Sequence, residues 1–377
     1  MIKVWDYNQE YKVLRKKILK CVDDVFMSGT LVFGPALDKF EKNFTQFIGT
    51  KYGLGVGNGT DALEIALKAC GIGPGDEVIT TSNTAVPTVT AIVNAGAKPC
   101  FVDVDEFYLM NSNLLENKIN NKTKAIIPVH LYGQSCNMNN INKIAKKNNL
   151  YVIEDCAQSH GATYNNKTTG SLGDIGCFSF YPTKILGGYG DGGFITTNNQ
   201  KLFDKMMRIR FLGMERKKMS SGHWNGKYYA VEHGTNSRLD EVHAAILSVK
   251  LKYLKSWIKK RRNIAKKYYE SLNNIGLKLP DEVKGNEHAY YVYVVSHEKR
   301  DQIMKELEKN GIFVNISYPW PIHIMEPYKK YCKNGNSLKN TNAFSKTIFS
   351  LPMHPYLKIK EQNKVIKVMK KILRDLV

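Results

Sequence analysis

A lysine followed by a glycine-rich segment is the part of the chain best suited to covalent chemistry. Lys184 follows an apolar run that ends at Phe180, and five of the seven residues Gly187–Gly193 are glycine. Glycines let the backbone and a neighbouring side chain approach a ligand without crowding. A lysine amine forms an imine with a cofactor aldehyde when desolvation or nearby positive charge favours its neutral form. Lys184 is therefore the candidate for a covalent bond to a cofactor.

Two carboxylates end the apolar segment Tyr151–Asp155. Ligands of open α/β sheets lie beyond the carboxyl ends of the strands, so we expect Asp155 at the rim of a site. It could serve as a metal ligand, an acid or base, or a fixed charge that keeps a cofactor nitrogen protonated. The plainer interpretation is the N-cap of a helix.

A second glycine-rich turn, Gly55–Leu63, opens directly into a helical pattern. Free backbone N–H groups at a helix start form a natural phosphate cradle. The turn has neither the lysine of a P-loop nor the spacing GxGxxG, so an ordinary tight turn is the alternative.

The elements that must position these residues alternate between short apolar runs and helical patterns, which is typical of an α/β fold with a mainly parallel sheet. Strands are expected at 52–56, 77–81, 98–104, 124–131, 150–155, 174–180 and 193–197, and helices at 36–48, 60–70, 84–95 and 138–148. Apolar residues at steps of three and four predict one long helix over Leu239–Leu272. A smaller C-terminal α/β domain should follow, with a strand at 290–295 and helices at 300–310 and 361–376. The predicted division is 1–245 for the large domain and 246–377 for the connecting helix and small domain.

Composition limits the class of protein. The 377 residues are long enough for a large core, no apolar stretch is long enough for a membrane helix, and the polar start favours a cytoplasmic location. The seven cysteines lack a CxxC spacing and are read as buried apolar residues, so no metal site is predicted. The net charge of +21 is the one feature that favours nucleic acid, but the lysines are scattered, so neither nucleic acid nor a membrane is expected as a partner.

Four motifs in a fixed order make the prediction specific: GNGTDAL, EDCAQSHGA, FSFYPTKILGGYGDGG and NSRLDEVHAAIL. Together they resemble the DegT/DnrJ/EryC1/StrS family of nucleotide-sugar aminotransferases, which depend on pyridoxal 5′-phosphate and have the type I (aspartate aminotransferase-like) fold. The resemblance extends from SGTLVFGPALDKFE near the start to LPMHPY near the end.

The resemblance implies a role for each matching position. Lys184 matches the catalytic Schiff-base lysine, and Asp155 matches the carboxylate that pairs with the pyridinium nitrogen. Gln158 matches the side chain beside the cofactor's phenolic oxygen. The phosphate contacts match Gly59, Thr60, Ser179 and Asn236. In the family the asparagine reaches across from the partner subunit, which implies a homodimer with shared active sites.

The resemblance also implies a substrate. The donor should be L-glutamate, with Lys184 moving the proton in both halves of the reaction. Tyr181 in the segment YPTK is similar to members that aminate C3 of a dTDP-linked 3-keto-6-deoxyhexose in deoxyamino-sugar biosynthesis. Tyr181, Tyr318 and His323 are the candidate hexose contacts, with ordinary packing as the alternative. A 4-aminotransferase acting on a 4-keto sugar is the second interpretation.

Two positions depart from the family pattern or need comment. Ala85 stands where members often carry an aromatic residue stacked on the cofactor ring. His160 is interpreted as a hydrogen-bonded structural histidine. Related dehydratases carry histidine at the lysine position, so Lys184 argues against that activity, and a complete cofactor constellation argues against a DNA-binding regulator.

Overall fold

The computed structural model describes residues 1–214, 217–218, 224–225, 229–332 and 338–376. A seven-stranded sheet lies at its centre, with strand order β1-β9-β8-β5-β4-β2-β3. The strands are β1 (Tyr52–Val56), β2 (Glu77–Thr81), β3 (Lys98–Val102), β4 (Thr123–Ile126), β5 (Tyr151–Asp155), β8 (Ile175–Ser179) and β9 (Gly193–Thr197). Only β9 runs antiparallel to its neighbours, so the prediction of a mainly parallel sheet is confirmed.

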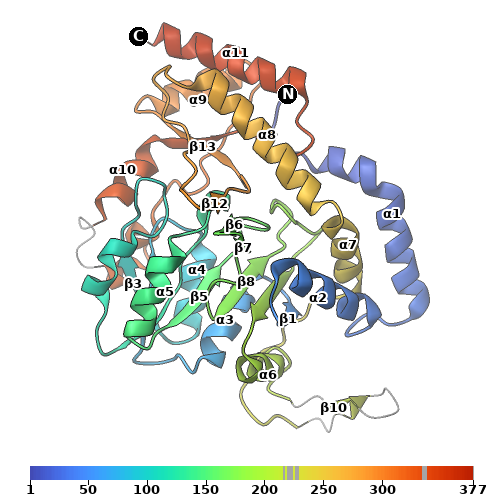
Figure 1. Ribbon diagram of the computed structural model, residues 1–377. Helices are drawn as coiled ribbons and strands as arrows, with labels where there is room; N and C mark the ends of the chain where they lie inside the picture. Colours follow the sequence, from blue (N-terminus) through green and yellow to red (C-terminus); the bar gives the residue numbers. More distant parts are fainter. Residues whose placement is uncertain (215–216, 219–223, 226–228, 333–337, 377) are drawn as a thin grey trace.

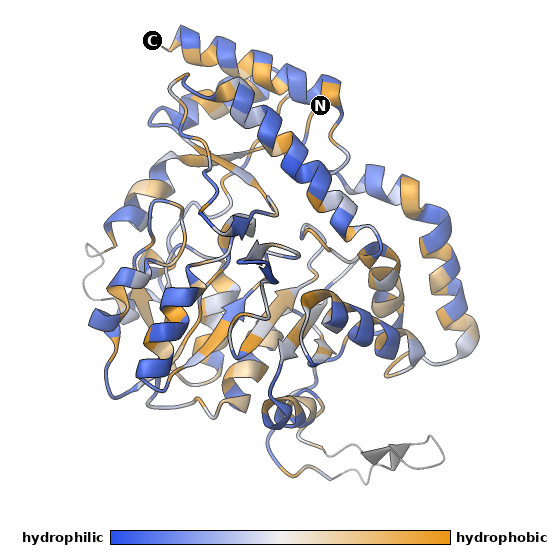
Figure 2. Cartoon of the chain, in the orientation of Figure 1, coloured by the Kyte–Doolittle hydropathy of each residue, from blue (hydrophilic) through white to orange (hydrophobic). Residues whose placement is uncertain are grey.

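Helices cover both faces of this sheet, as the apolar strands require (Figure 1). One core joins the sheet to α3 (Gly59–Ala69), α4 (Val86–Asn94) and α6 (Gln200–Ile209). On the other face lie α2 (Pro35–Ile48), α5 (Met138–Lys147) and α7 (Glu241–Leu251), with α1 (Tyr7–Ser28) packed outside α7. Hydrophobic residues gather in the strands and on the inner sides of the helices (Figure 2).

The prediction of one continuous helix over Leu239–Leu272 is wrong. The chain forms α7 and then α8 (Leu254–Leu272), separated at Lys252 and Tyr253. At the break the backbone N–H of Tyr253 donates to Lys250 three residues back, which tightens the turn. The apolar spacing continues across the break because α7 packs in the core of the large sheet, whereas α8 continues into a second core. A periodic pattern records which residues are apolar but not which core each segment faces.

The second core lies in the C-terminal region, where α8 packs against two strands and two helices. Its elements are β13 (Tyr293–Ser296), β14 (Ile348–Leu351), α9 (Arg300–Lys309) and α11 (Ile359–Asp375), and α10 (Lys339–Thr347) precedes β14. Ile2 pairs with Ile312, which ties the N-terminus to this region. The small domain and its boundary at 245/246 stay predictions.

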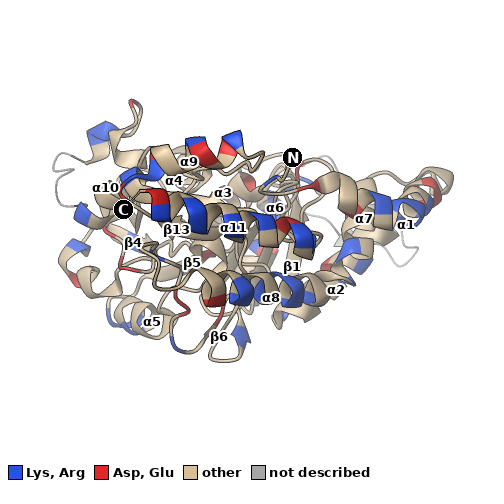
Figure 3. Cartoon of the chain, turned by 90° about the horizontal axis from the view of Figure 1, so that it is seen from above, with Lys and Arg blue, Asp and Glu red and all other residues tan. Residues whose placement is uncertain are grey.

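The remaining strands are short. β6 (Thr163–Tyr164), β7 (Lys167–Thr168) and β12 (Asn286–Glu287) form one small sheet, and β10 (Lys217–Lys218) pairs with β11 (Trp224–Asn225). Lys and Arg residues are frequent along α8 and α11, with acidic residues among them (Figure 3). Within the described residues, no helix is long and apolar enough to cross a membrane.

Candidate active site

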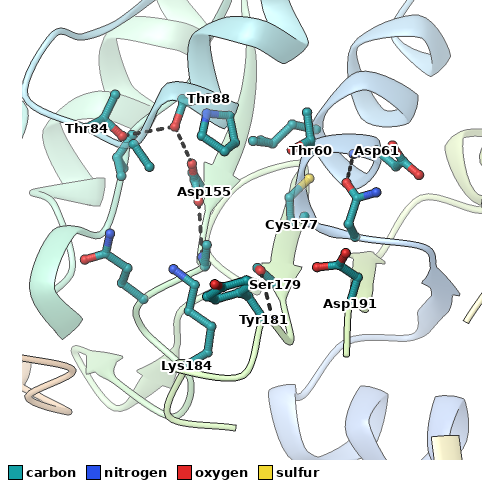
Figure 4. Close-up of a pocket in the computed structure, with 18 residues that line it drawn as sticks. Thr60, Asp61, Thr84, Thr88, Asp155, Cys177, Ser179, Tyr181, Lys184 and Asp191 are labelled. Atoms are coloured by element: carbon teal, nitrogen blue, oxygen red, sulfur yellow. Dashed lines mark hydrogen bonds between the residues drawn. The ribbon is translucent and has the colours of Figure 1, made fainter. Parts of the chain in front are cut away.

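A pocket of about 460 Å³ lies where β5 and β8 end and α3 and α4 begin (Figure 4). The position agrees with the rule that ligands of such sheets bind beyond the carboxyl ends of the strands. Seven predicted site residues line it together: Gly59, Thr60, Asp155, Gln158, Ser179, Tyr181 and Lys184. Residues up to 125 positions apart in the sequence thus meet in one cavity.

The start of α3 forms one side of the pocket. The Asn58 side chain caps the helix by accepting a hydrogen bond from the backbone N–H of Asp61 at 2.9 Å. A side chain at Gly59 would put its Cβ 2.7 Å from the Ser179 Cβ, so only glycine allows this close approach. The N–H groups of the first helical turn have no intrahelical partners. This cradle therefore fits a phosphate group beside Thr60 and Ser179.

Asp155 is held by two hydrogen bonds at the end of β5. The Thr88 hydroxyl donates to Oδ2 at 2.8 Å, and the backbone N–H of Ala157 donates to Oδ1 at 3.1 Å. The carboxylate is only 5% exposed. No helix begins after Asp155, so the N-cap interpretation is wrong. Thr88 was missed by the sequence analysis because a threonine within an apolar helix carries no distinguishing signal.

Lys184 enters the pocket from the segment after β8. In Figure 4 its side chain extends into the cavity that Asp155 also lines. Nζ lies 4.9 Å from the centre of the Tyr291 ring, and the Lys184 backbone N–H donates to the Tyr181 carbonyl. The glycines that follow are packed, not loose: a Cβ at Gly187 would lie 2.3 Å from the Pro182 carbonyl oxygen. Their role is to let the chain fold tightly next to Lys184.

Gln158 connects the pocket to the C-terminal region. Its Oε1 accepts from the backbone N–H of Tyr132 at 2.8 Å, and its Nε2 donates to the Tyr318 hydroxyl at 2.5 Å. Tyr318 itself lines an adjoining cavity and meets the pocket residue Gln158 through this bond. Burial raises the pKa of the Tyr318 hydroxyl well above its usual value, so Tyr318 stays neutral.

The other predicted residues lie in different surroundings. Tyr181 is 53% exposed at the pocket, where a substrate can reach it. His323 is buried, its Nδ1 lies 2.7 Å from the Ser82 hydroxyl, and it does not line the pocket. Asn236 is exposed and pairs with Phe211, also away from the pocket. The hexose contact of His323 and the partner-subunit role of Asn236 both stay predictions.

His160 packs against the rings of Phe44, Phe178 and Phe180. Burial, followed by the charge of Lys184, lowers its pKa to about 3, so it is neutral at physiological pH. A hydrogen bond with the backbone of Ser179 acts in the opposite direction and raises the pKa. The surrounding aromatic rings and the burial support the interpretation of His160 as a structural histidine.

The described residues bring together one set of potential metal ligands, His130, Glu154 and Cys156, all buried. The Glu154 carboxylate accepts from His130 Nε2 and from the backbone N–H groups of residues 170, 172 and 173, at 2.7–2.8 Å. With four donors on its two oxygens, Glu154 has a structural role in fixing the turn before β8.

The residues in the pocket fit pyridoxal phosphate. The cradle suits the phosphate, a buried carboxylate suits a protonated ring nitrogen, and Lys184 suits the aldehyde. The side near Ala85 is lined by Ala85 and Pro87, without an aromatic ring. This agrees with the departure from the family pattern noted in the sequence.

Comparisons with known proteins agree with this geometry. The model of the DegT/DnrJ/EryC1/StrS aminotransferase family matches residues 12–370. A dTDP-3-amino-3,4,6-trideoxy-alpha-D-glucose transaminase from Micromonospora megalomicea subsp. nigra is 43% identical and covers 99% of both chains. A dTDP-3-amino-3,6-dideoxy-alpha-D-galactopyranose transaminase from Aneurinibacillus thermoaerophilus is 40% identical, covering 97% of this chain and 98% of its own. A pleiotropic regulatory protein from Geobacillus stearothermophilus is 41% identical, covering 96% and 95%.

The fold agrees with a solved structure as well. The crystal structure of Streptomyces venezuelae DesV in complex with a ketimine intermediate superposes with a TM-score of 0.93 at 34% identity, covering 99% of this chain and 98% of that one. The predicted type I fold is thereby confirmed. The chain belongs to the DegT/DnrJ/EryC1/StrS aminotransferase family and is an enzyme that transfers amino groups with pyridoxal phosphate.

Proposed function

We propose that this enzyme transfers an amino group, from L-glutamate, to C3 of a dTDP-linked 3-keto-6-deoxyhexose. The observation that carries the proposal is the pocket in which Lys184 meets Asp155 and the phosphate cradle of α3. The substrate class is supported by two relatives, at 43% and 40% identity, which are named for dTDP-linked 3-amino sugars.

Each residue of the pocket has a distinct task. Pyridoxal phosphate, when bound, supplies an aldehyde for the lysine and an electron-accepting ring. Lys184 Nζ would hold this aldehyde, and its free amine would move a proton at the reacting carbon of the substrate. The Asp155 carboxylate, which accepts a hydrogen bond from Thr88, would stabilise positive charge on the ring nitrogen. Gln158 and the cradle fix the orientation of the ring and the phosphate.

Borohydride reduction tests the position of the covalent bond. The purified protein should be yellow, and reduction should remove the imine absorption and leave a pyridoxyl group on Lys184, detectable by peptide mass spectrometry. Lys184→Ala should lose turnover and keep its fold, because the side chain acts chemically. A pyridoxyl group on another lysine, or Lys184→Ala activity within about tenfold of wild type, would refute the assignment.

The regiochemistry is tested on the product. With dTDP-3-keto-6-deoxyglucose or its galacto epimer, NMR should place nitrogen at C3, and the 4-keto isomer should be a poor substrate. Tyr181, exposed in the pocket, is the hexose contact that the geometry favours, while His323 is a weaker candidate because it does not line the pocket. Nitrogen at C4, or a better kcat/KM with a 4-keto sugar, would favour the 4-aminotransferase alternative.

A homodimer with shared sites is part of the proposal. Asn236 lies outside its own chain's pocket, and large apolar side chains are exposed along α1 and the following turn, which supports a subunit interface there. Mixing Lys184→Ala protein with an Asn236→Ala variant should restore activity through hybrid dimers. No recovery after verified subunit exchange would count against shared sites.

A regulatory role is the alternative of another class, and one relative is named a pleiotropic regulatory protein. The pocket argues against regulation as the sole function, because Lys184, Asp155 and the phosphate cradle of α3 all line it. A cytoplasmic location stays a prediction.

A further inference from the structure

A second cavity, of about 150 Å³, adjoins the Lys184 pocket. Its lining includes Thr183, the residue before Lys184, and Tyr291, whose ring lies 4.9 Å from Lys184 Nζ. Tyr318 forms another part of its wall and accepts the hydrogen bond from Gln158. Tyr291 and Tyr318 thus each contact a residue that lines the Lys184 pocket. The volume corresponds to about five water molecules, at ~30 Å³ for each.

Arg261 is the one charged side chain among the described residues that line this cavity. It is only 5% exposed. Its Nη1 donates to three backbone carbonyls, those of Tyr290, Tyr291 and Met353, at 2.9–3.2 Å. These bonds fix the guanidinium but bring no negative charge to it. Nε is buried and has no acceptor among the described residues.

Arg261 has no carboxylate of its own among the residues that the structure describes. Glu10 is the acidic group whose charge acts on Arg261, but Glu10 is already paired with the buried Lys250 at 2.5 Å. Burial lowers the pKa of Arg261 to about 10, so the guanidinium still carries its charge at neutral pH. Arg261 and Lys250 are thus two buried cations with the single carboxylate of Glu10 near them, whereas buried charges are normally each paired. The cavity therefore favours an anion.

We propose that this cavity binds a carboxylate of the amino donor through Arg261, an inference that rests on the proposed function. A guanidinium matches the planar fork of a carboxylate better than any other side chain. Ser317, Asn315 and Thr183 offer further polar contacts, and the ring of Trp5 can cover aliphatic carbons of the donor. A nucleoside diphosphate is too large for this volume, because sites for such ligands measure about 300–1,000 Å³.

Location supports the same ligand. The donor must bring its amine to Lys184, and its carboxylate is only one carbon away from that amine. An anion site lined by the residue before Lys184 meets this requirement. The keto-sugar has its charge on a distant diphosphate and gains nothing from a carboxylate site here.

Arg261→Met tests the proposal, with Arg262→Met as the matched control. Arg262 is the next residue of the same helix, pairs with Glu282 at 2.8 Å, and does not line this cavity. In the holoenzyme, the two halves of the reaction are measured separately: L-glutamate with the pyridoxal form, and keto-sugar with the pyridoxamine form. Calorimetry with glutarate, which has no amine and cannot react, measures carboxylate binding directly, with glutaramide as the neutral probe.

Arg261→Met should raise KM for L-glutamate and Kd for glutarate by about ten- to a hundredfold, the range for a hydrogen bond to a charged group. Its keto-sugar half-reaction should change less than about twofold, and Arg261→Lys should fall between wild type and Arg261→Met. Arg262→Met should behave as wild type in every measurement. Equal glutarate binding by the two methionine variants would overturn the proposal.

Two further outcomes separate the alternatives. A raised KM for the keto-sugar with an unchanged donor step, and competition by inorganic phosphate, would assign the cavity to the nucleotide and refute the donor site. Wild-type protein that binds pyridoxal phosphate but never transaminates would refute the proposed function, while the glutarate titration would still decide the carboxylate site. If Arg261→Met does not fold, Trp5→Ala and Ser317→Ala decide, since unchanged glutarate binding in both would contradict the proposal.

Discussion

Thr88 offers a sharp test of how the pocket holds the Asp155 carboxylate. Its hydroxyl is fully buried, donates to Asp155 Oδ2 at 2.8 Å, and lies 3.0 Å from the Thr84 hydroxyl. Thr88→Val keeps the branched shape and removes the donor. The remaining bond to the carboxylate comes from the backbone N–H of Ala157, at the longer distance of 3.1 Å.

A hydrogen bond to a charged group contributes about 1.5–3 kcal/mol, which corresponds to a factor of about 10 to 150 in rate if the whole effect falls on the transition state. Ala157 keeps part of the stabilisation, so we expect kcat of Thr88→Val to fall by roughly tenfold. KM for the keto-sugar should change little, because Thr88 contacts Asp155 and not the hexose position at Tyr181. The free energy of unfolding should also fall, because the Asp155 carboxylate stays buried with one donor fewer.

Thr88→Ser is the control, because it keeps the hydroxyl and removes only a methyl group. Both variants are compared by single-turnover rates for each half of the reaction, by the pH dependence of the cofactor absorption, and by urea unfolding. Thr88→Ser should retain most of the rate. Equal kcat in Thr88→Val and Thr88→Ser would refute the idea that the hydrogen bond from the Thr88 hydroxyl to Asp155 supports catalysis.

Three further predictions concern groups that hold the fold around the site. Lys250 is fully buried, pairs with Glu10 and donates to the Gly187 carbonyl. Lys250→Met should therefore lower the free energy of unfolding, measured with urea, by about 3–5 kcal/mol. Glu10→Gln should cause a similar loss, and a double variant that loses less than the sum of the two would show that the pair is coupled. The Glu241 carboxylate accepts three backbone N–H bonds at the start of α2, at 2.8–2.9 Å, so Glu241→Gln should cost about 2 kcal/mol, and an unchanged melting curve would contradict this cap. Burial lowers the pKa of His288 from 6.5 to about 3, so the folded state keeps the imidazole neutral. The stability of the folded state that depends on this neutral form is fully present above pH 6.5 and is lost as the pH falls toward 3. In the wild type this histidine should lower the free energy of unfolding by about 1.4 kcal/mol for each pH unit below 6.5. Urea unfolding of His288→Asn should lack this part of the pH dependence, and an identical pH slope in the variant would exclude the histidine as its source.

Local sequence patterns predicted the parts of the fold that depend on residues close together in the chain. The apolar strands and the segments between them predicted the parallel sheet, because a strand buried on both faces must be apolar at nearly every position. The glycine at the start of α3 and the lysine after β8 were recognisable because each motif is contiguous: the cradle and Lys184 depend on residues a few positions apart. Their order along the chain was enough to indicate the family.

The tertiary structure decided what depends on distant partners. Thr88 supports Asp155 across 67 residues, and Gln158 meets Tyr318 across 160, so neither pair has a sequence signal. The separation of α7 from α8 follows from two different cores on a single apolar pattern. Arg261 shows the same limit: its sequence neighbour Arg262 is chemically identical but pairs with Glu282, while Arg261 is buried beside the Lys184 pocket. Residue type determines what a group can do, but its burial and its neighbours determine whether it does so, and these are set only when distant segments pack together.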